Sequence, residues 1–153
     1  MTRERCSSPG GAVCGETGFG LILIDGNAVI AYTSALLAFL LRETGHEQVA
    51  PALPHACMST LNLAETVGRF VRDGHDAQAI TIQLRRVGLE FVPFTEEHAT
   101  LTASLLPITK RFGLSICDRA CLALAKSRGL PVLTADRVWL DVQALGIEIQ
   151  VIR

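Results

Sequence analysis

The sequence predicts a single α/β domain with a mainly parallel central sheet. The chain has 153 residues, which is the length of one domain at about 100–200 residues per domain. Hydrophobic residues make up 49% of the chain and charged residues 19%, so a core can form, and disordered or collagen-like chains are excluded. Short apolar runs alternate with segments of helical pattern along the chain, which is typical of parallel sheets with helical crossovers.

The start of the chain is predicted to be a flexible leader over residues 1–19, followed by one domain over residues 20–153. The leader carries charged residues and a Pro-Gly-Gly sequence at 9–11 where a signal peptide would be apolar. The longest charge-free apolar stretch, 26–41, is shorter than the about 18–20 apolar residues that a membrane span needs. We therefore expect a cytoplasmic protein that does not associate with membranes.

The cysteines are predicted to be free, reduced thiols. Their number is odd, and no Cys-x-x-Cys pair occurs. The four histidines do not supply closely paired ligands for zinc either. The five cysteines are Cys6, Cys14, Cys57, Cys117 and Cys121.

The first half of the domain is predicted to contain two strands and two helices. Residues 20–25 form a continuous apolar run that ends on an acid, which is typical of a central parallel strand covered on both faces. A long buried helix is predicted from about 27 to 42, with Asn27 as its N-cap. A short strand at 55–59 and a helix from Thr60 to about Arg72 follow.

The second half continues the alternation. Helices are predicted at about 76–86, from Thr95 to Gly113, and at about 118–128, with a short helix around Trp139. Strands are predicted at 89–93, 131–134 and 147–151.

Four acids draw attention because of their positions. Ligands of open parallel sheets bind beyond the carboxyl ends of the strands, where Asp25 and Asp136 are predicted to lie. Asp118 stands at a helix start, and Glu65 lies within the helix from Thr60 on the face that carries Asn62. Carboxylates meeting in one cleft repel and raise one another's pKa. A hard divalent cation removes that cost, because Mg²⁺ prefers carboxylate and water oxygens.

Each acid also has a plainer explanation. Asp118 and Asp136 are both suited to capping a helix or turn. Glu65 is spaced to form an exposed ion pair with Arg69, which stabilises a helix by a few tenths of a kcal/mol. Their order and their local sequence decide between these readings.

Four segments carry a resemblance to a known family: Ile22–Ala28, Leu61–Glu65, Leu114–Ala125 and Val132–Trp139. They resemble the PIN-domain ribonucleases and, within these, the VapC-like toxins of bacterial toxin–antitoxin pairs. The resemblance implies a three-layer α/β/α fold with a mainly parallel sheet. It also implies an antitoxin partner, an RNA substrate and a homodimer.

By the same resemblance, the acidic site would hold Mg²⁺ or Mn²⁺. Its ligands and catalytic residues would be Asp25, Glu65, Asp118 and Asp136. Thr134 would support the fourth acid, and Asn62 would line the helix face of Glu65. The chain departs from the family where Gly26-Asn27 replaces a small residue plus serine or threonine, although Asn27 still offers a polar group. Cys117 stands where such toxins often have glycine.

These residues predict a Mg²⁺- or Mn²⁺-dependent endoribonuclease, in which a metal-activated water attacks the phosphorus. Arg119 and Arg137 each follow a candidate acid, so either could contact a substrate phosphate. A net charge of −1 argues against a non-specific nucleic-acid coat protein.

Two alternatives remain open: an RNA-processing nuclease without an antitoxin, and a catalytically silent antitoxin-binding protein. An aspartyl-phosphate phosphotransferase ranks well behind, because position 27 is Asn where that chemistry needs a second acid. No glycine-rich nucleotide loop supports it either.

Overall fold

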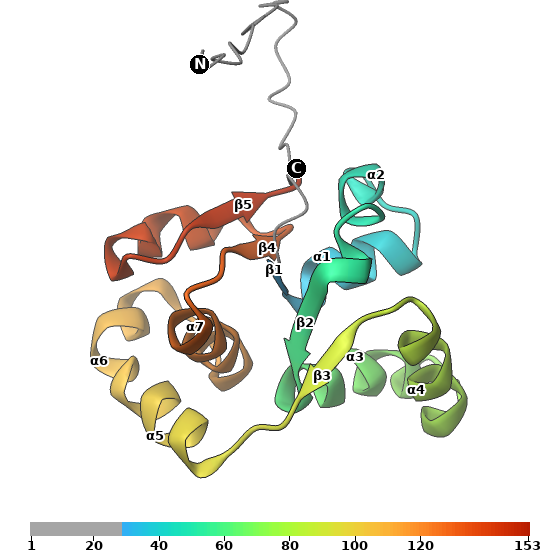
Figure 1. The fold of residues 1–153 in the computed structure, drawn as a ribbon, viewed down its shortest axis with the longest axis horizontal. Helices are drawn as coiled ribbons and strands as arrows, with labels where there is room; N and C mark the ends of the chain where they lie inside the picture. The colour runs from blue at the N-terminus through green and yellow to red at the C-terminus, as the bar shows by residue number, and fades with distance from the viewer. Residues whose placement is uncertain (1–28) are drawn as a thin grey trace, which may run out of the picture.

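A five-stranded parallel sheet forms the centre of the domain (Figure 1). The computed structural model describes residues 29–153, apart from the side chains of residues 143 and 144. The strand order is β3-β2-β1-β4-β5, and all four neighbouring pairs are parallel. The strands are β1 (Val29–Ala31), β2 (Ala56–Ser59), β3 (Glu90–Val92), β4 (Val132–Thr134) and β5 (Ile149–Val151).

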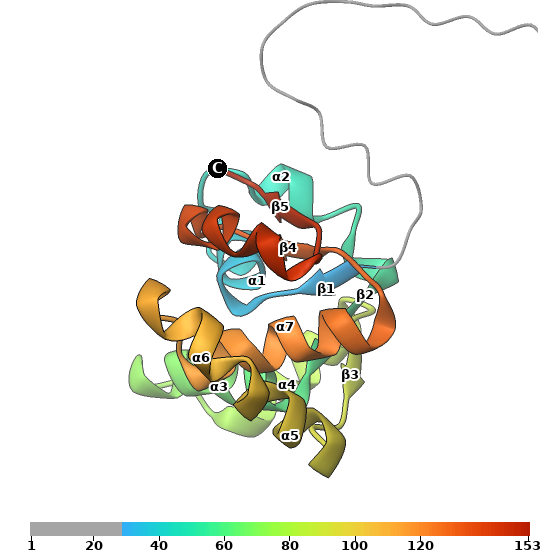
Figure 2. The same ribbon diagram turned by 90° about the vertical axis from the view of Figure 1, so that its left-hand side faces the viewer.

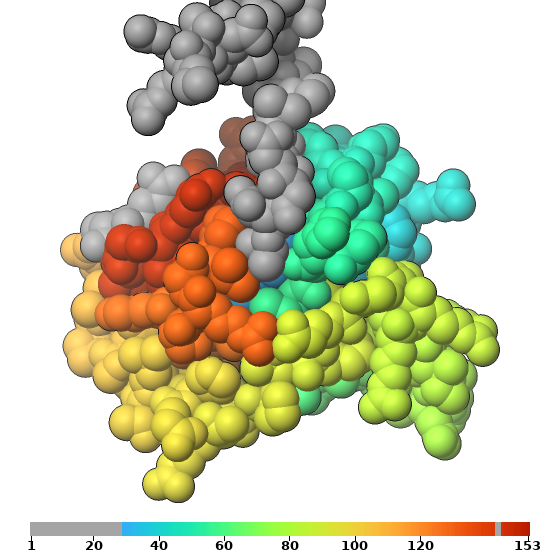
Figure 3. Space-filling model, in the orientation of Figure 1, coloured from blue at the N-terminus to red at the C-terminus, as the bar shows by residue number. Residues whose placement is uncertain are grey.

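Helices connect the strands. The α-helices of residues 29–153 are α1 (Thr33–Leu40), α2 (His46–Val49), α3 (Thr60–Arg72), α4 (Ala77–Arg86), α5 (Glu96–Ser104), α6 (Leu106–Thr109) and α7 (Ile116–Arg128). Short 3₁₀ helices are η1 (Leu53–His55), η2 (Lys110–Phe112) and η3 (Arg137–Leu145). On the outer surface, α4 and α5 form separate projections (Figure 3).

Two hydrophobic clusters cover the two faces of the sheet. Ile30 of β1 faces a cluster that includes α7 and Trp139, whereas its neighbours Val29 and Ala31 face a cluster that includes α1. This alternation follows from the two-residue period of a strand. Figure 2 shows α7 running beneath β1, with α5 and α6 beyond it. The layers are therefore helix, sheet and helix, and the predicted α/β fold class is confirmed.

The first strand differs from the prediction. The centre of the sheet is β1 (Val29–Ala31), which pairs with both β2 and β4, and residues 20–25 lie outside the described residues. The predicted helix from 27 to 42 is therefore wrong in its first part, and the helix runs from Thr33 to Leu40. Ile30 donates its backbone N–H to Pro131 (2.8 Å), and Tyr32 donates to Leu133 (3.0 Å). These long-range bonds hold Val29–Ala31 extended despite its helix-compatible pattern.

The remaining predicted elements agree with the structure to within a few residues. One exception is the helix predicted from Thr95 to Gly113, which divides into α5, α6 and η2. Pro107 stands in the first turn of α6, where its missing N–H cannot continue the preceding helix. Within the described chain, Cys57, Cys117 and Cys121 are free. Among residues 29–153, no helix has the length and apolar character to cross a bilayer.

Candidate functional site

The carboxyl edge of the sheet gathers three of the predicted acids. Asp136 follows β4, Glu65 lies on α3 directly after β2, and Asp118 lies in the first turn of α7. Asp25 and Asn27 lie outside the described residues. At the end of β1, where an acid is expected, the structure has Tyr32.

Tyr32 is buried between the sheet and α7. Its side chain is 8% exposed, and its ring centroid lies 4.6 Å from that of Trp139 with an interplanar angle of 38°. Burial, hydrogen bonding of the hydroxyl with Asp118, and the charges of Asp118 and Glu65 all raise its pKa. The phenol is therefore neutral at physiological pH.

The Glu65 side chain is positioned by a hydroxyl from the first residue of α1. Helix α3 begins behind the N-cap Ser59, whose side chain accepts from the N–H of Leu61. The Thr33 hydroxyl donates to Glu65 Oε2 at 2.7 Å. Arg69 pairs with Asp73 at 3.8 Å, so the alternative Glu65–Arg69 ion pair is not formed and the Glu65 carboxylate faces Thr33.

Asp118 is held by the start of its own helix. The Ser115 side chain accepts from the N–H of Asp118 at 3.2 Å, and the Asp118 carboxylate accepts from the N–H of Ser115. This reciprocal pair is a capping box. The N-cap is therefore Ser115, and Asp118 is the N3 residue of the box rather than the N-cap itself. This pairing fixes the Asp118 carboxylate at the start of α7.

Asp136 is positioned by hydroxyls at the end of β4. The buried Thr134 hydroxyl accepts from the N–H of Asp136 at 3.1 Å and lies 3.1 Å from the Ser34 hydroxyl. Ser34 accepts from the N–H of Ala135 at 2.9 Å. The exposed Asp136 carboxylate accepts from the N–H of Val138 at 3.1 Å, which orients it at the start of η3.

Asn62 connects α3 to α7. Its side-chain amide donates to the Cys117 carbonyl at 2.9 Å, and the residue is 1% exposed. Its Oδ1 atom has no hydrogen-bond partner among residues 29–153. Asn62 therefore joins the two helices that carry Glu65 and Asp118.

The two arginines have different surroundings. Arg119 is half-buried and donates from Nη1 to the Leu114 carbonyl at 2.8 Å, so its guanidinium is committed to the loop before α7. Arg137 is exposed and donates from Nε to the Arg153 carbonyl at 3.1 Å. Of the two, Arg137 is better placed to contact a phosphate in solvent.

Glu65 and Asp118 act together on their neighbours. Burial, with the charges of Glu65 and Asp118, raises the pKa of Cys117 to about 11. Burial raises the pKa of Cys121 as well, with further contributions from both acids. Both thiols are therefore protonated at neutral pH, and neither is a nucleophile there.

The donor set fits a hard divalent ion in kind, because carboxylate oxygens are the ligands that Mg²⁺ and Mn²⁺ prefer. Its arrangement is incomplete, because the part of the chain that the structure describes has no group of three His, Cys, Asp or Glu side chains close enough to hold a metal. The charges of Glu65 and Asp118 both raise the pKa of Tyr32, and Asp136 follows the neighbouring strand β4.

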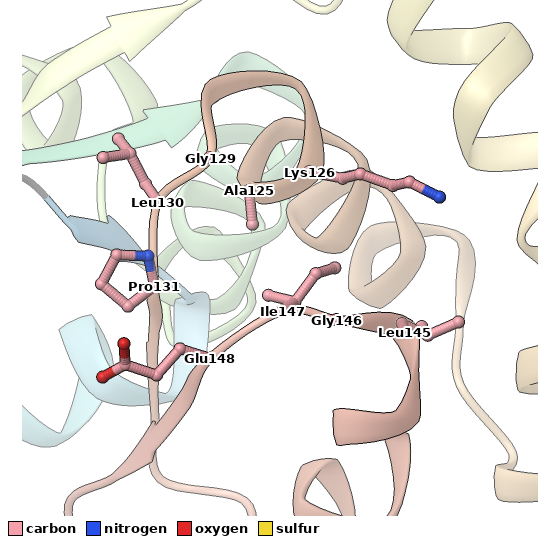
Figure 4. Close-up of a pocket in the computed structure, with 9 residues that line it drawn as sticks. All are labelled: Ala125, Lys126, Gly129, Leu130, Pro131, Leu145, Gly146, Ile147 and Glu148. Carbon is pink, nitrogen blue, oxygen red and sulfur yellow. The ribbon is translucent and has the colours of Figure 1, made fainter.

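A pocket elsewhere takes no part in this site (Figure 4). Pro131 and Glu148, which line it, precede β4 and β5, so the pocket opens at the amino edge of the sheet. None of its lining residues is a predicted site residue.

Sequence reasoning missed the three consecutive residues Tyr32, Thr33 and Ser34. All three fell within the helix predicted from 27 to 42; Thr33 and Ser34 do begin α1, whereas Tyr32 is its N-cap directly after β1. The hydroxyls of Thr33 and Ser34 contact α3 and the end of β4. The available signal was the run of hydroxyl side chains Tyr32-Thr33-Ser34, which follows the β-branched pair Val29-Ile30 after one alanine.

The comparisons with known proteins agree with this fold. The PIN domain family model matches residues 22–145, and the chain belongs to the PIN domain family, a family of nucleases. No curated protein matches the sequence.

Several solved structures are similar in fold. A toxin–antitoxin complex from Klebsiella pneumoniae has a TM-score of 0.64 and 14% identity, over 82% of this chain and 98% of that chain. DNA-bound VapBC from Salmonella typhimurium has a TM-score of 0.61 and 18% identity, over 83% and 99%. FitAcB from Neisseria gonorrhoeae has a TM-score of 0.60 and 19% identity, over 79% and 95%. At these identities the likeness concerns the fold.

Proposed function

We propose that this chain is a metal-dependent endoribonuclease and the toxin of a toxin–antitoxin pair, acting in the cytoplasm. The observation that carries the proposal is the placement of Glu65, Asp118 and Asp136 at the carboxyl edge of the sheet in a PIN-domain chain. Each carboxylate is held by a hydrogen bond from a neighbouring residue. Acids at this edge lie where open parallel sheets bind their ligands.

The proposed metal is Mg²⁺ or Mn²⁺. Glu65, Asp118 and Asp136 would hold it together with Asp25. When bound, such an ion polarises a phosphodiester and lowers the pKa of a coordinated water. The residues of the chain have defined supporting tasks: Thr33 orients Glu65, and Ser115 orients Asp118.

The remaining supporting tasks belong to the end of β4. Thr134 fixes the backbone of Asp136. The exposed guanidinium of Arg137 is available to bind an RNA phosphate beside it.

The experiment is cleavage of a panel of structured RNAs with Mg²⁺, with Mn²⁺, and with EDTA. Asp118→Asn and Asp25→Asn should each reduce metal-dependent cleavage by at least about a hundredfold, since each removes a proposed ligand charge. Asp76→Asn is the matched control, because Asp76 caps α4 by accepting from the N–H of Ala79, and Asn caps equally well. Cleavage that persists in EDTA, or in both site variants, would contradict the proposal.

The proposed partner is an antitoxin that covers the site. Two of the similar structures are described as a toxin–antitoxin complex and as DNA-bound VapBC. Ile116, two residues before Asp118, is 55% exposed, which offers an apolar contact beside the carboxylates. A stoichiometric small protein should co-purify with the chain and be released by Ile116→Asp. If it does not, the free-standing RNA-processing nuclease becomes the better interpretation.

A homodimer is also proposed. Sedimentation equilibrium of the purified chain at micromolar concentration should give twice the monomer mass. A monomer throughout that range would exclude this part of the proposal.

A second candidate function is a catalytically silent antitoxin-binding protein. The observation that favours it is Tyr32, a neutral and buried phenol at the end of the central strand. If this second function is correct, the chain binds the antitoxin but cuts no RNA of the panel at any Mg²⁺ or Mn²⁺ concentration.

A further inference from the structure

We propose that η2 (Lys110–Phe112) binds an unpaired nucleotide of the substrate RNA beside the start of α7. Arg111 would stack on the base of this nucleotide, and Lys110 would contact a phosphate of the same strand. This inference rests on the proposed function, because it names the class of RNA that the site would accept, an RNA that is single-stranded at this nucleotide.

The charges of this segment are exposed and unpaired. Lys110 and Arg111 are both exposed, and no acidic residue occurs in the sequence between Glu97 and Asp118. Within residues 29–153, neither side chain takes part in an ion pair, in contrast to Arg128, which pairs with the Glu90 carboxylate. Both cations are therefore available to an anionic ligand.

The ring of Phe112 holds the Arg111 guanidinium in place. Phe112 is half-buried and packs against the hydrophobic cluster that includes α7. Arg111 Cζ lies 4.5 Å from the centroid of this ring, within the range of a cation–π interaction. Because the ring packs on the core and Arg111 is exposed, the outer face of the guanidinium stays open to a ligand. A side chain held in this way loses less entropy when a ligand binds.

The segment after Arg111 is anchored to the start of α7. The buried Leu114 accepts from Arg119 Nη1 at 2.8 Å through its carbonyl. Ser115 shares a capping box with Asp118. Four residue steps separate Arg111 from Ser115, which is at most about 14 Å of backbone. One RNA strand can therefore contact Arg111 while it lies at the proposed metal site.

The chemistry of this surface favours an unpaired base. Guanidinium planes and aromatic rings are the surfaces on which splayed-out bases stack. The bases of an RNA duplex are stacked on one another, and its deep, narrow major groove does not admit side chains. Lysine, by comparison, acts as a point charge that a phosphate of any sequence satisfies. The pair Lys110 and Arg111 therefore predicts a preference for single-stranded RNA.

The test is fluorescence anisotropy of a short labelled RNA strand titrated with the full chain, alone and annealed to its complement. Ca²⁺ replaces Mg²⁺, because it also binds carboxylate oxygens, and a gel of each sample checks that the strand is intact. We expect the single strand to bind at least about fivefold more tightly than the duplex. Equal affinities, or no binding of the single strand, would overturn the inference.

Two variants separate stacking from charge. Arg111→Lys keeps the charge and removes the plane, so it should weaken single-strand binding at least about fivefold and leave duplex binding unchanged. Lys110→Gln should make the slope of log affinity against log salt shallower by about 0.7, the value for one phosphate contact on a single strand. The matched control is Lys126→Gln, because Lys126 is also exposed but lines the pocket at the amino edge of the sheet. It should change neither quantity.

A surface that offers only positive charge, such as one for an acidic peptide, would tolerate Arg111→Lys, and that result overturns the inference. Phe112→Leu keeps an apolar side chain against the core and removes the ring beneath Arg111. It should weaken binding in the wild-type background and add no further loss to Arg111→Lys, since the two residues are in contact. Additive losses would contradict the role of Phe112. Arg111→Lys, a change at an exposed residue, decides if Phe112→Leu does not fold.

RNA cleavage separates this inference from the proposed function. If the variants bind the single strand as expected and no RNA of the panel is cut with Mg²⁺ or Mn²⁺, the inference stands and the nuclease proposal fails. If RNA is cut in a way that depends on Asp118 while Arg111→Lys binds as wild type does, the nuclease proposal stands and the inference fails.

Discussion

The hydrogen bond from Thr33 to Glu65 should contribute measurably to stability. Thr33 is 5% exposed, and its hydroxyl donates to the Glu65 carboxylate at 2.7 Å. Hydrogen bonds to charged groups contribute about 1.5–3 kcal/mol, and the half-buried position of Glu65 places this one near the lower end. Thr33→Val, which keeps the shape of the side chain, should therefore lower the free energy of unfolding by about 1.5 kcal/mol.

A second threonine supplies the matched control. Thr102 is 2% exposed, but its hydroxyl has no partner among residues 29–153. Replacing an unpartnered buried hydroxyl by a methyl group is neutral or stabilising. Thr102→Val should therefore leave the free energy of unfolding unchanged or increase it.

Urea unfolding of both variants at pH 7 measures the difference, and thermal unfolding should show Thr33→Val melting about 4 °C lower than wild type. The double variant Thr33→Val/Glu65→Gln should lose less than the sum of the single variants, because the two residues are in contact. Equal unfolding free energies for Thr33→Val and Thr102→Val would refute the reasoning.

Three other predictions concern the packing, the cap and one ion pair. Trp139→Ala should cost about 3–5 kcal/mol in urea unfolding, because Trp139 is fully buried; a cost below about 1 kcal/mol would contradict its place in the core. Ser115→Ala should cost about 1 kcal/mol by removing the acceptor for the N–H of Asp118, and Ser115→Asn, tested beside it, should lose less. The hydrogen bond from Arg128 lowers the pKa of Glu90. The pair therefore stabilises the folded state fully above the ordinary glutamate pKa of about 4.3, and this stabilisation is lost as the pH falls through the lowered pKa. The free energies of unfolding of wild type and Glu90→Gln should differ by less than about 1 kcal/mol at pH 7 and become equal near pH 2. A difference that grows as the pH is lowered would contradict the prediction.

Most of the fold could be predicted because local signals agree with tertiary packing. Helix α3 runs from Thr60 to Arg72 as predicted, since an N-cap serine opens it and Asp73-Gly74 ends it. The first strand could not be placed, because two apolar runs compete for one position. Residues 20–25 end on an acid, whereas Val29–Ala31 leads without a break into α1. Pairing with β2 and β4 decides in favour of Val29–Ala31, and that pairing has no local signature.

The candidate site was only partly predictable for the same reason. Asp118 and Asp136 begin a helix and follow a strand, so their local sequence defines where they lie. The acid at the end of the central strand depends on which residues form that strand. Among the described residues that strand is β1, and Tyr32 follows it. Asp25 remains a prediction.

Three successive residues after β1 tie three separate parts of the chain together. Tyr32 meets the start of α7, Thr33 bonds to α3, and Ser34 bonds to the end of β4. The three residues share one short backbone segment, so a displacement of that segment breaks all three contacts together. In hydrogen exchange, the first turns of α7 and the end of β4 should therefore exchange together with β1, as one cooperative unit. The positions of Glu65 and of the backbone before Asp136 would then depend on the same short segment.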